Sequence, residues 1–213
     1  MNSTKLLLSA FGAALLLTLA LYFLPTQEPN TKKTEQTAAE SAPTTSGSVA
    51  FLLNTADSLR DLLSGQQDAA ARESMGKTAI AVYKQVLQQD PSNLDAKAGM
   101  GFCLAEASPQ PMSGIMMLRE VVKTDPNHEN GQLFLGLLSL QSGQLDKAID
   151  RFEKVIVLDS ENNNVLLLLG RTYAETGNRK KALEIFMRLK EKSTEPSIKQ
   201  EAESWIAKLQ SAS

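Results

Sequence analysis

A stretch of 34 residues occurs twice in succession, and this repeat constrains the fold more than any other feature of the sequence. When residues 129–162 are aligned with residues 163–196, small and large side chains fall on matching positions. The matched pairs are Leu135 and Leu169, Gly136 and Gly170, Gly143 and Gly177, Lys147 and Lys181, Ala148 and Ala182, and Phe152 and Phe186. A period of this length is typical of helical hairpins that stack into a solenoid, because one hairpin alone cannot bury its apolar face.

The repeat extends toward the N-terminus with small irregularities. Met100 and Gly101 precede Leu135 and Gly136 by 35 residues, and Asp125 precedes Asp159 by 34. A half-repeat follows the same spacing further upstream, where Ala79, Tyr83, Asp90 and Pro91 precede Gly114, Leu118, Asp125 and Pro126 by 35. The spacing therefore predicts helical hairpins over residues 95–128, 129–162 and 163–195, with a degenerate repeat over residues 49–94.

The segment "LLLLGRTYAETGNRKKALEIF" (residues 166–186) resembles the tetratricopeptide repeat family. The family pattern places Leu-Gly and a later Tyr on a first helix and Ala-x-x-x-Phe on a second. Leu169, Gly170, Tyr173, Gly177, Ala182 and Phe186 match it. In the preceding repeat Ser139 replaces the Tyr, and Gln132 and Leu166 stand where the family carries an early aromatic residue. The resemblance implies an all-α tetratricopeptide superhelix, in which first helices line a concave groove that binds proteins or peptides.

The two ends of the predicted repeat domain (residues 49–212) are less regular. "VAFLLNTADSLRDLLSG" (residues 49–65) has one apolar face, and the first repeat is long enough for about ten extra residues between its helices. At the other end, Ile198, Ala202 and Trp205 lie on one stripe of residues 196–212. Because a terminal repeat leaves an open apolar face, this last segment is predicted to be a capping helix.

An uncharged apolar run extends from Leu6 to Leu24. As a helix it would be about 28 Å long, close to the thickness of a bilayer's hydrocarbon core. The run ends in "LYFLP", which lacks the small residues that precede a cleavage point, so residues 1–24 are predicted to be an uncleaved, single-pass transmembrane anchor. A signal peptide cleaved after Ala20 and a buried soluble helix remain alternatives.

Residues 25–48 are rich in Thr, Ser, Pro, Glu and Ala and contain no large apolar residue, so they are predicted to be a disordered linker. Lys5 precedes the apolar run and Lys32 and Lys33 follow it, so the distribution of positive charge does not fix the orientation in the membrane. Short N-terminal anchors usually leave the long carboxyl-terminal domain outside the cytoplasm. We expect that orientation here, on the periplasmic side if the cell is bacterial.

Composition excludes several classes of function. The chain has 22 Lys and Arg against 24 Asp and Glu, and this balance gives no basic footprint for nucleic acid. Its one cysteine, Cys103, excludes an internal disulfide and a cysteine-rich metal site, and it is expected to pack in the core. The one histidine, His128, is expected to be a solvated loop residue between repeats. No metal, cofactor or nucleic-acid partner is predicted.

One motif suggests an enzyme. "ARESMGKT", Ala71 to Thr78, matches a relaxed phosphate-loop pattern, with Ala71 in place of the first glycine. Phosphate binding requires an open turn between a buried strand and a helix, whereas both flanks here are good helix formers. We therefore predict that the protein is not an enzyme, and nucleotide binding at this segment remains a remote alternative.

The run "VLLLLG" (residues 165–170) contains more apolar residues than one buried helix face requires. Either neighbouring helices cover the surplus, or part of it forms the floor of an apolar groove. The predicted groove residues are Phe102, Leu133, Leu137, Leu140, Leu167 and Arg171. Family members that clamp a carboxylate use Lys and Asn in the groove, so the leucines argue against that ligand.

These observations predict a membrane-anchored tetratricopeptide adaptor that binds a partner protein or peptide and assists assembly of an envelope complex. The layout is similar to that of bacterial envelope assembly factors. Self-association into a homo-oligomer with a structural role is the alternative. The two differ in crosslinking, because self-association would capture only this chain.

Overall fold

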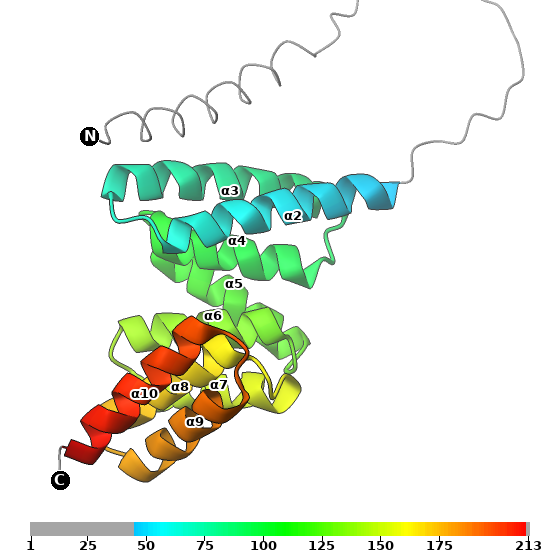
Figure 1. The fold of residues 1–213 in the computed structure, drawn as a ribbon. Coiled ribbons are helices and arrows are strands. Elements are labelled where there is room, and N and C mark those ends of the chain that lie inside the picture. The colour runs from blue at the N-terminus through cyan, green and yellow to red at the C-terminus, as the bar shows by residue number, and fades with distance from the viewer. Residues whose placement is uncertain (1–44, 212–213) are drawn as a thin grey trace, which may run out of the picture. The chain divides into compact units, whose positions relative to one another are not determined.

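Residues 45–211 are described by the structure, which is a computed structural model, and all regular structure among them is helical (Figure 1). Nine helices follow one another in this part of the chain. They are α2 (Thr45–Ser64), α3 (Ala69–Gln89), α4 (Leu94–Ala107), α5 (Pro111–Thr124), α6 (Glu129–Gln141), α7 (Leu145–Leu158), α8 (Asn163–Glu175), α9 (Arg179–Lys192) and α10 (Pro196–Ser211). The predicted all-α, helical-hairpin solenoid is confirmed.

Local sequence signals explain where these helices begin and turn. Asn93, Asn162 and Asn178 are N-caps, and the side-chain oxygen of each accepts a hydrogen bond from a backbone N–H in the first turn of α4, α8 or α9. Gly143 and Gly177 have φ of 70° and 77°, the left-handed conformation that glycine adopts without strain. Both glycines close the turn inside a hairpin, and they lie one repeat apart.

Close helix packing within a hairpin depends on glycine at two positions. A Cβ atom at Gly136 would lie 2.6 Å from Cε1 of Phe152, and one at Gly170 would lie 2.9 Å from Cε1 of Phe186. Both phenylalanine side chains have no exposed surface. The two glycines therefore make room for a ring from the second helix of the same hairpin.

The apolar core is divided along the chain into three clusters of buried residues. The first joins α2, α3 and α4, the second joins α4, α5 and α6, and the third joins α7, α8, α9 and α10. Leu133 and Leu137 of α6 pack against both the second and the third cluster. Each hairpin thus buries its apolar side against the next one, which is how repeat solenoids gain stability.

The first hairpin differs from the prediction in two ways. Its helices α2 and α3 are 20 and 21 residues long, and only residues 65–68 separate them. The extra residues of this repeat therefore lengthen the helices, and the prediction of an insertion between them was wrong. In addition, α2 begins at Thr45, so residues 45–48 belong to a helix and not to the predicted linker.

The last helix, α10, covers the end of the third core cluster, as expected of a cap. Ile198 and Ala202 are buried in that cluster, and the ring of Trp205 stacks on Phe186 with centroids 5.6 Å apart. Without α10, the buried face of α9 would be open to water. Residues 196–211 thus complete the core, in agreement with the sequence pattern.

No helix within residues 45–211 combines the length and the apolar character needed to cross a membrane. The predicted anchor (Leu6–Leu24) and most of the predicted linker lie outside the described residues.

Candidate protein-binding site

The predicted groove residues lie on the first helices of three successive hairpins, α4, α6 and α8, and the residue on α4 is buried. Phe102 of α4 is only 4% exposed and stacks on Phe134 of α6, with ring centroids 4.6 Å apart. The guanidinium of Arg60, from α2, lies over the Phe134 ring at 5.1 Å from its centroid. Phe102 is therefore part of the core, and α2 shields this aromatic pair from solvent.

Arg60 is held in place by its own polar partners. It donates hydrogen bonds to Asp57 at 2.6 Å and Asp61 at 2.8 Å, and Tyr83 Oη donates to the same Asp57 carboxylate at 2.6 Å. Burial raises the pKa of Tyr83 above its ordinary value, and the hydrogen bond to Asp57 adds to the rise. Tyr83 therefore stays a neutral donor, and the Arg60 charge is balanced inside the first hairpin.

The central leucines are mostly covered as well. Leu167 is 9% exposed, and Leu133 and Leu137 are half-buried against two core clusters. Most of the leucine surplus is thus packed between neighbouring helices, which was one of the two interpretations of the sequence. The assignment of Leu133, Leu137 and Leu167 as partner contacts stays a prediction, although little of their surface is available.

The other interpretation fits the carboxyl-terminal end of the series. Here α6, α8 and α10 border an open hollow with a volume of about 550 Å³, within the range of protein ligand pockets. Its lining consists of Leu140, Leu168, Arg171, Thr172, Ala174, Glu175, Trp205, Lys208 and Leu209. Two of the predicted groove residues, Leu140 and Arg171, are thus brought together in one place. We call this feature the apolar hollow.

Charged side chains from α8 and α10 also line the apolar hollow, and one of them is paired within the chain. Arg171 forms an ion pair with Glu201 of α10, and the same carboxylate accepts a hydrogen bond from Trp205 Nε1 at 3.4 Å. Lys208 Nζ lies 4.5 Å from the centroid of the Trp205 ring. Arg171 therefore already has a carboxylate partner within the chain, and it also ties α8 to the cap.

Sequence reasoning did not assign Leu168, Trp205 and Leu209 to this site. Trp205 was recognised as part of the apolar stripe of a capping helix, but the position of Trp205 and Leu209 in the lining of the apolar hollow depends on how α10 lies against α8. Their spacing of four residues places them on one helix face, and the tryptophan was the available signal. A terminal helix that carries a large aromatic residue can cover the core and also border a groove.

The phosphate-loop match lies within a regular helix. Ala71 to Thr78 fall inside α3, Gly76 is buried, and Lys77 pairs with Glu73 at 2.6 Å one turn away. The backbone of this segment is thus helical on both sides of Gly76, as its flanks predicted. A phosphate cradle would need those N–H groups in an open turn.

The single histidine and the single cysteine of the chain both have structural roles. His128 was expected to be solvated, and this was wrong, since its side chain is 10% exposed and Nδ1 accepts a hydrogen bond from Gly131 N at 3.1 Å. It is the N-cap of α6, and Nε2 lies 3.4 Å from Asp95. Cys103 is fully buried, as expected, and burial raises the pKa of its thiol to about 12.

Comparison with known proteins agrees with this architecture. Residues 139–200 match the sequence model of the tetratricopeptide repeat family. That segment contains all of α7, α8 and α9, and the helices before it continue the same hairpin pattern. The described chain is thus a tetratricopeptide-type helical repeat fold, and residues 139–200 are the part that the family model recognises.

Curated relatives resemble only a part of this chain. A probable UDP-N-acetylglucosamine–peptide N-acetylglucosaminyltransferase, SPINDLY from Arabidopsis thaliana, is 26% identical over 82 residues, which are 38% of this chain and 9% of that protein. The SPINDLY protein of Hordeum vulgare is 30% identical over 76 residues, or 8% of its length. The chain thus spans less than a tenth of these relatives, and the match concerns repeats alone.

Two solved structures share the fold. A tetratricopeptide repeat protein from Parabacteroides merdae superposes with a TM-score of 0.55 at 12% identity, covering 78% of this chain and 61% of that one. YrrB, described as a tetratricopeptide protein with an unusual peptide-binding site, gives a TM-score of 0.50 at 22% identity, covering 73% and 88%. At these identities the likeness concerns the fold.

Proposed function

We propose that this protein is a membrane-anchored adaptor that binds a partner protein through the apolar hollow. In this proposal Leu6–Leu24 anchor the chain, and the following residues tether the repeat domain outside the cytoplasm. The bound partner is a component of an envelope complex under assembly. The protein acts by binding and not by catalysis.

The observation that carries this proposal is the composition of the apolar hollow. Leu140, Leu168, Trp205 and Leu209 come from three helices and line one open space, together with three charged residues, Arg171, Glu175 and Lys208. A large aromatic residue beside leucines is the composition of binding hot spots, where a few anchors supply most of the energy. The resemblance to YrrB, described as having a peptide-binding site, supports the same class of function.

The shape of the site favours a short apolar segment as the ligand. One or two apolar side chains of a partner helix would lie against Leu168 and Trp205, because that contact removes apolar surface from water on both sides. Lys208 lies over the Trp205 ring, where it can pair with an acidic group at the edge of the partner's segment. Apolar anchors would give affinity, and the edge charge would give orientation.

Crosslinking of the full chain in its own cell tests this proposal. Leu140→Glu places a charge in the apolar hollow and should abolish capture of the partner, while helical content is retained. Val157→Glu is the matched control, because Val157 is 84% exposed on α7 and does not line the apolar hollow. Equal capture by both variants would place the site elsewhere, and capture of only this chain would favour self-association.

Membrane fractionation tests the anchor separately. We expect the full chain to sediment with membranes and to resist carbonate extraction, because an apolar helix of this length leaves a bilayer only at great cost. A mature N-terminus near Leu21 would contradict the anchor and indicate a cleaved signal peptide. Protease added outside the cytoplasmic membrane should digest the repeat domain if the proposed orientation holds.

A further inference from the structure

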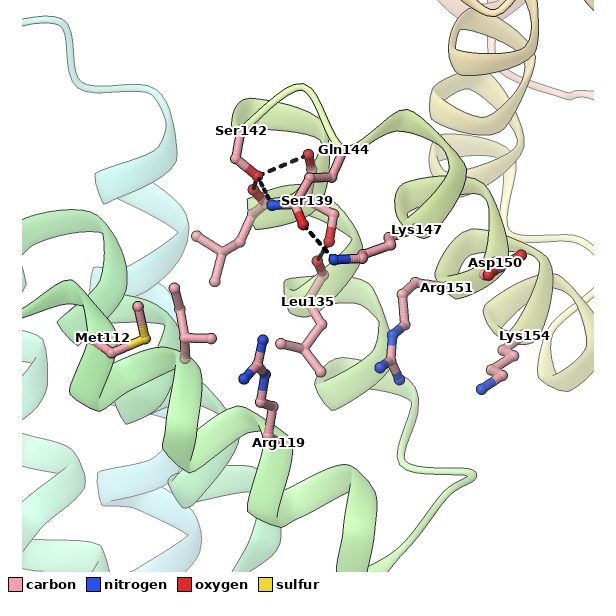
Figure 2. A pocket seen from close by; sticks show the side chains of 12 residues that line it. Met112, Arg119, Leu135, Ser139, Ser142, Gln144, Lys147, Asp150, Arg151 and Lys154 are labelled. Atoms are coloured by element: carbon pink, nitrogen blue, oxygen red, sulfur yellow. Dashed lines mark hydrogen bonds between the residues drawn. The ribbon is translucent and has the colours of Figure 1, made fainter.

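A second pocket lies on another side of α6, between the second helices α5 and α7 (Figure 2). It has a volume of about 300 Å³, and its lining includes four cationic side chains, one carboxylate and Ser139. The charged residues are Arg119, Lys147, Asp150, Arg151 and Lys154. We call it the cationic pocket. Its positive charge stands out because the chain as a whole has a formal net charge of −2.

The repeat register identifies what fills the equivalent place in the next hairpin. There Tyr173 of α8 lies between α7 and α9, and its hydroxyl donates a hydrogen bond to Glu153. Lys181 Nζ donates to Tyr173 Oη at 2.8 Å, lies 3.3 Å from the Glu153 carboxylate, and sits 4.7 Å from the centroid of the Tyr173 ring. A phenol, a carboxylate and an ammonium group thus close this junction from within the chain.

In the cationic pocket two of these three groups are replaced by other side chains. Residues 34 positions before Glu153, Tyr173 and Lys181 are Arg119, Ser139 and Lys147. The Ser139 hydroxyl is small and donates back to Leu135 O on its own helix at 2.7 Å. The lysine is therefore retained, while the ring is missing and a guanidinium stands where the carboxylate was.

A buried polar contact fixes one more cation at this place. Arg151 Nη1 donates to Gln132 Oε1 at 2.6 Å, and the Gln132 amide donates in turn to Pro126 O at 2.6 Å. Gln132 is only 1% exposed, so it cannot swing out to release Arg151. Figure 2 shows Arg119 and Arg151 extending from α5 and α7 toward the space around Leu135. Two guanidinium groups on facing helices form a geometry suited to carboxylates.

We propose that the cationic pocket binds an acidic peptide segment of a partner protein. An aromatic side chain of that segment occupies the space beside Ser139, which is equivalent to the space that Tyr173 fills in the next hairpin. An adjacent carboxylate of the segment lies against Arg119 and Lys147. The ligand thus supplies from outside the two groups that the chain supplies itself one repeat later. This site is separate from the apolar hollow, and the inference does not depend on the function proposed for it.

Fluorescence anisotropy on the full chain in mild detergent tests the proposal. The probe is a labelled eight-residue peptide of alternating glutamate and tyrosine, compared with one in which glutamine replaces every glutamate. The double substitution Arg119→Glu/Ser139→Tyr rebuilds the Glu153–Tyr173–Lys181 arrangement inside the pocket. We expect it to weaken binding of the acidic peptide about tenfold or more, and to leave the melting temperature equal or higher.

Two control variants separate this result from other effects. Lys180→Glu changes the net charge by the same amount as Arg119→Glu, at an exposed position of α9 outside the pocket, and should leave affinity within about twofold. Leu140→Glu alters the apolar hollow and should also leave it unchanged. Should the double variant fail to fold, Arg119→Gln alone must still weaken binding several-fold.

Three outcomes would overturn the proposal. They are equal affinity for the glutamate and glutamine peptides, unchanged binding by the folded Arg119→Gln variant, and displacement of the peptide by inorganic phosphate at equal concentration. The last would indicate a site for small anions and not for a peptide.

Discussion

Replacement of Phe186 by alanine tests the packing on which the repeat domain depends. The Phe186 side chain has no exposed surface, lies directly against Gly170, and stacks on Trp205 of the capping helix. Truncation of a buried phenylalanine costs about 3–5 kcal/mol, and a stacked aromatic pair contributes about 0.5–1.5 kcal/mol of its own. Because both losses occur together here, we expect the free energy of unfolding to fall by about 5 kcal/mol.

Urea denaturation followed by circular dichroism measures this change. Met187→Ala is the neighbouring control, because Met187 is 51% exposed and its truncation should cost less than about 1 kcal/mol. Trp205 fluorescence should report that α10 detaches early in the Phe186→Ala variant, since the ring on which it stacks is gone. A loss below about 2 kcal/mol for Phe186→Ala would refute the packing argument.

Three further predictions concern single side chains. Hydrogen bonds from Tyr173 and Lys181 lower the pKa of Glu153 from its ordinary 4.5, so the stability that this carboxylate contributes is present above that value and is lost as the pH falls through the lowered pKa. Acid titration of the Glu153→Gln variant should lack this loss of stability, and identical titration profiles for the two proteins would contradict the prediction. Lys77→Ala should change the free energy of unfolding by less than about 0.5 kcal/mol, because Lys77 is exposed and forms only an i,i+4 ion pair. If nucleotide raises the melting temperature of the protein and this variant abolishes the rise, the phosphate-loop interpretation is restored. Burial holds the pKa of Cys103 at about 12, so iodoacetamide at pH 8 should modify the thiol only after denaturation, and fast modification of the native chain would show that it is accessible.

Much of the fold could be predicted because its signals are local. The predicted repeats begin at residues 95, 129 and 163, and the helices α4, α6 and α8 begin at Leu94, Glu129 and Asn163. Gly136 and Gly170, against which the Phe152 and Phe186 rings pack, also fall on matching positions of the sequence repeat. Side-chain caps and turn glycines act over three or four residues, so a single sequence contains the information.

The candidate sites were harder to predict because they depend on contacts between distant segments. Phe102 was expected at the groove, but Arg60, more than 40 residues earlier, lies over its stacking partner. Arg171 was also expected at the groove, and the structure pairs it with Glu201 of the capping helix α10. Which surplus leucine remains open is decided by α2 and α10, whose placement no local pattern specifies.

One signal for the cationic pocket was present in the sequence. Ser139 was recognised as a replacement for the tyrosine of the repeat pattern, and loss of so large a side chain implies unfilled space nearby. Arg119 stands at the position that Glu153 occupies one repeat later. This difference indicates a binding site only once the structure places each of the two residues beside a lysine. Residues that depart from the repeat pattern therefore indicate where one repeat has a surface feature that the next repeat lacks.

The most direct test of the proposed function uses the fluorescence of Trp205, the only tryptophan in the chain and a residue that lines the apolar hollow. A partner segment that enters the apolar hollow must remove water from this ring, so titration with the captured partner should shift the emission to shorter wavelength and saturate. Leu140→Glu should abolish the shift, and Val157→Glu should preserve it. Partner binding that crosslinking detects without any change in Trp205 emission would contradict the assignment of the site.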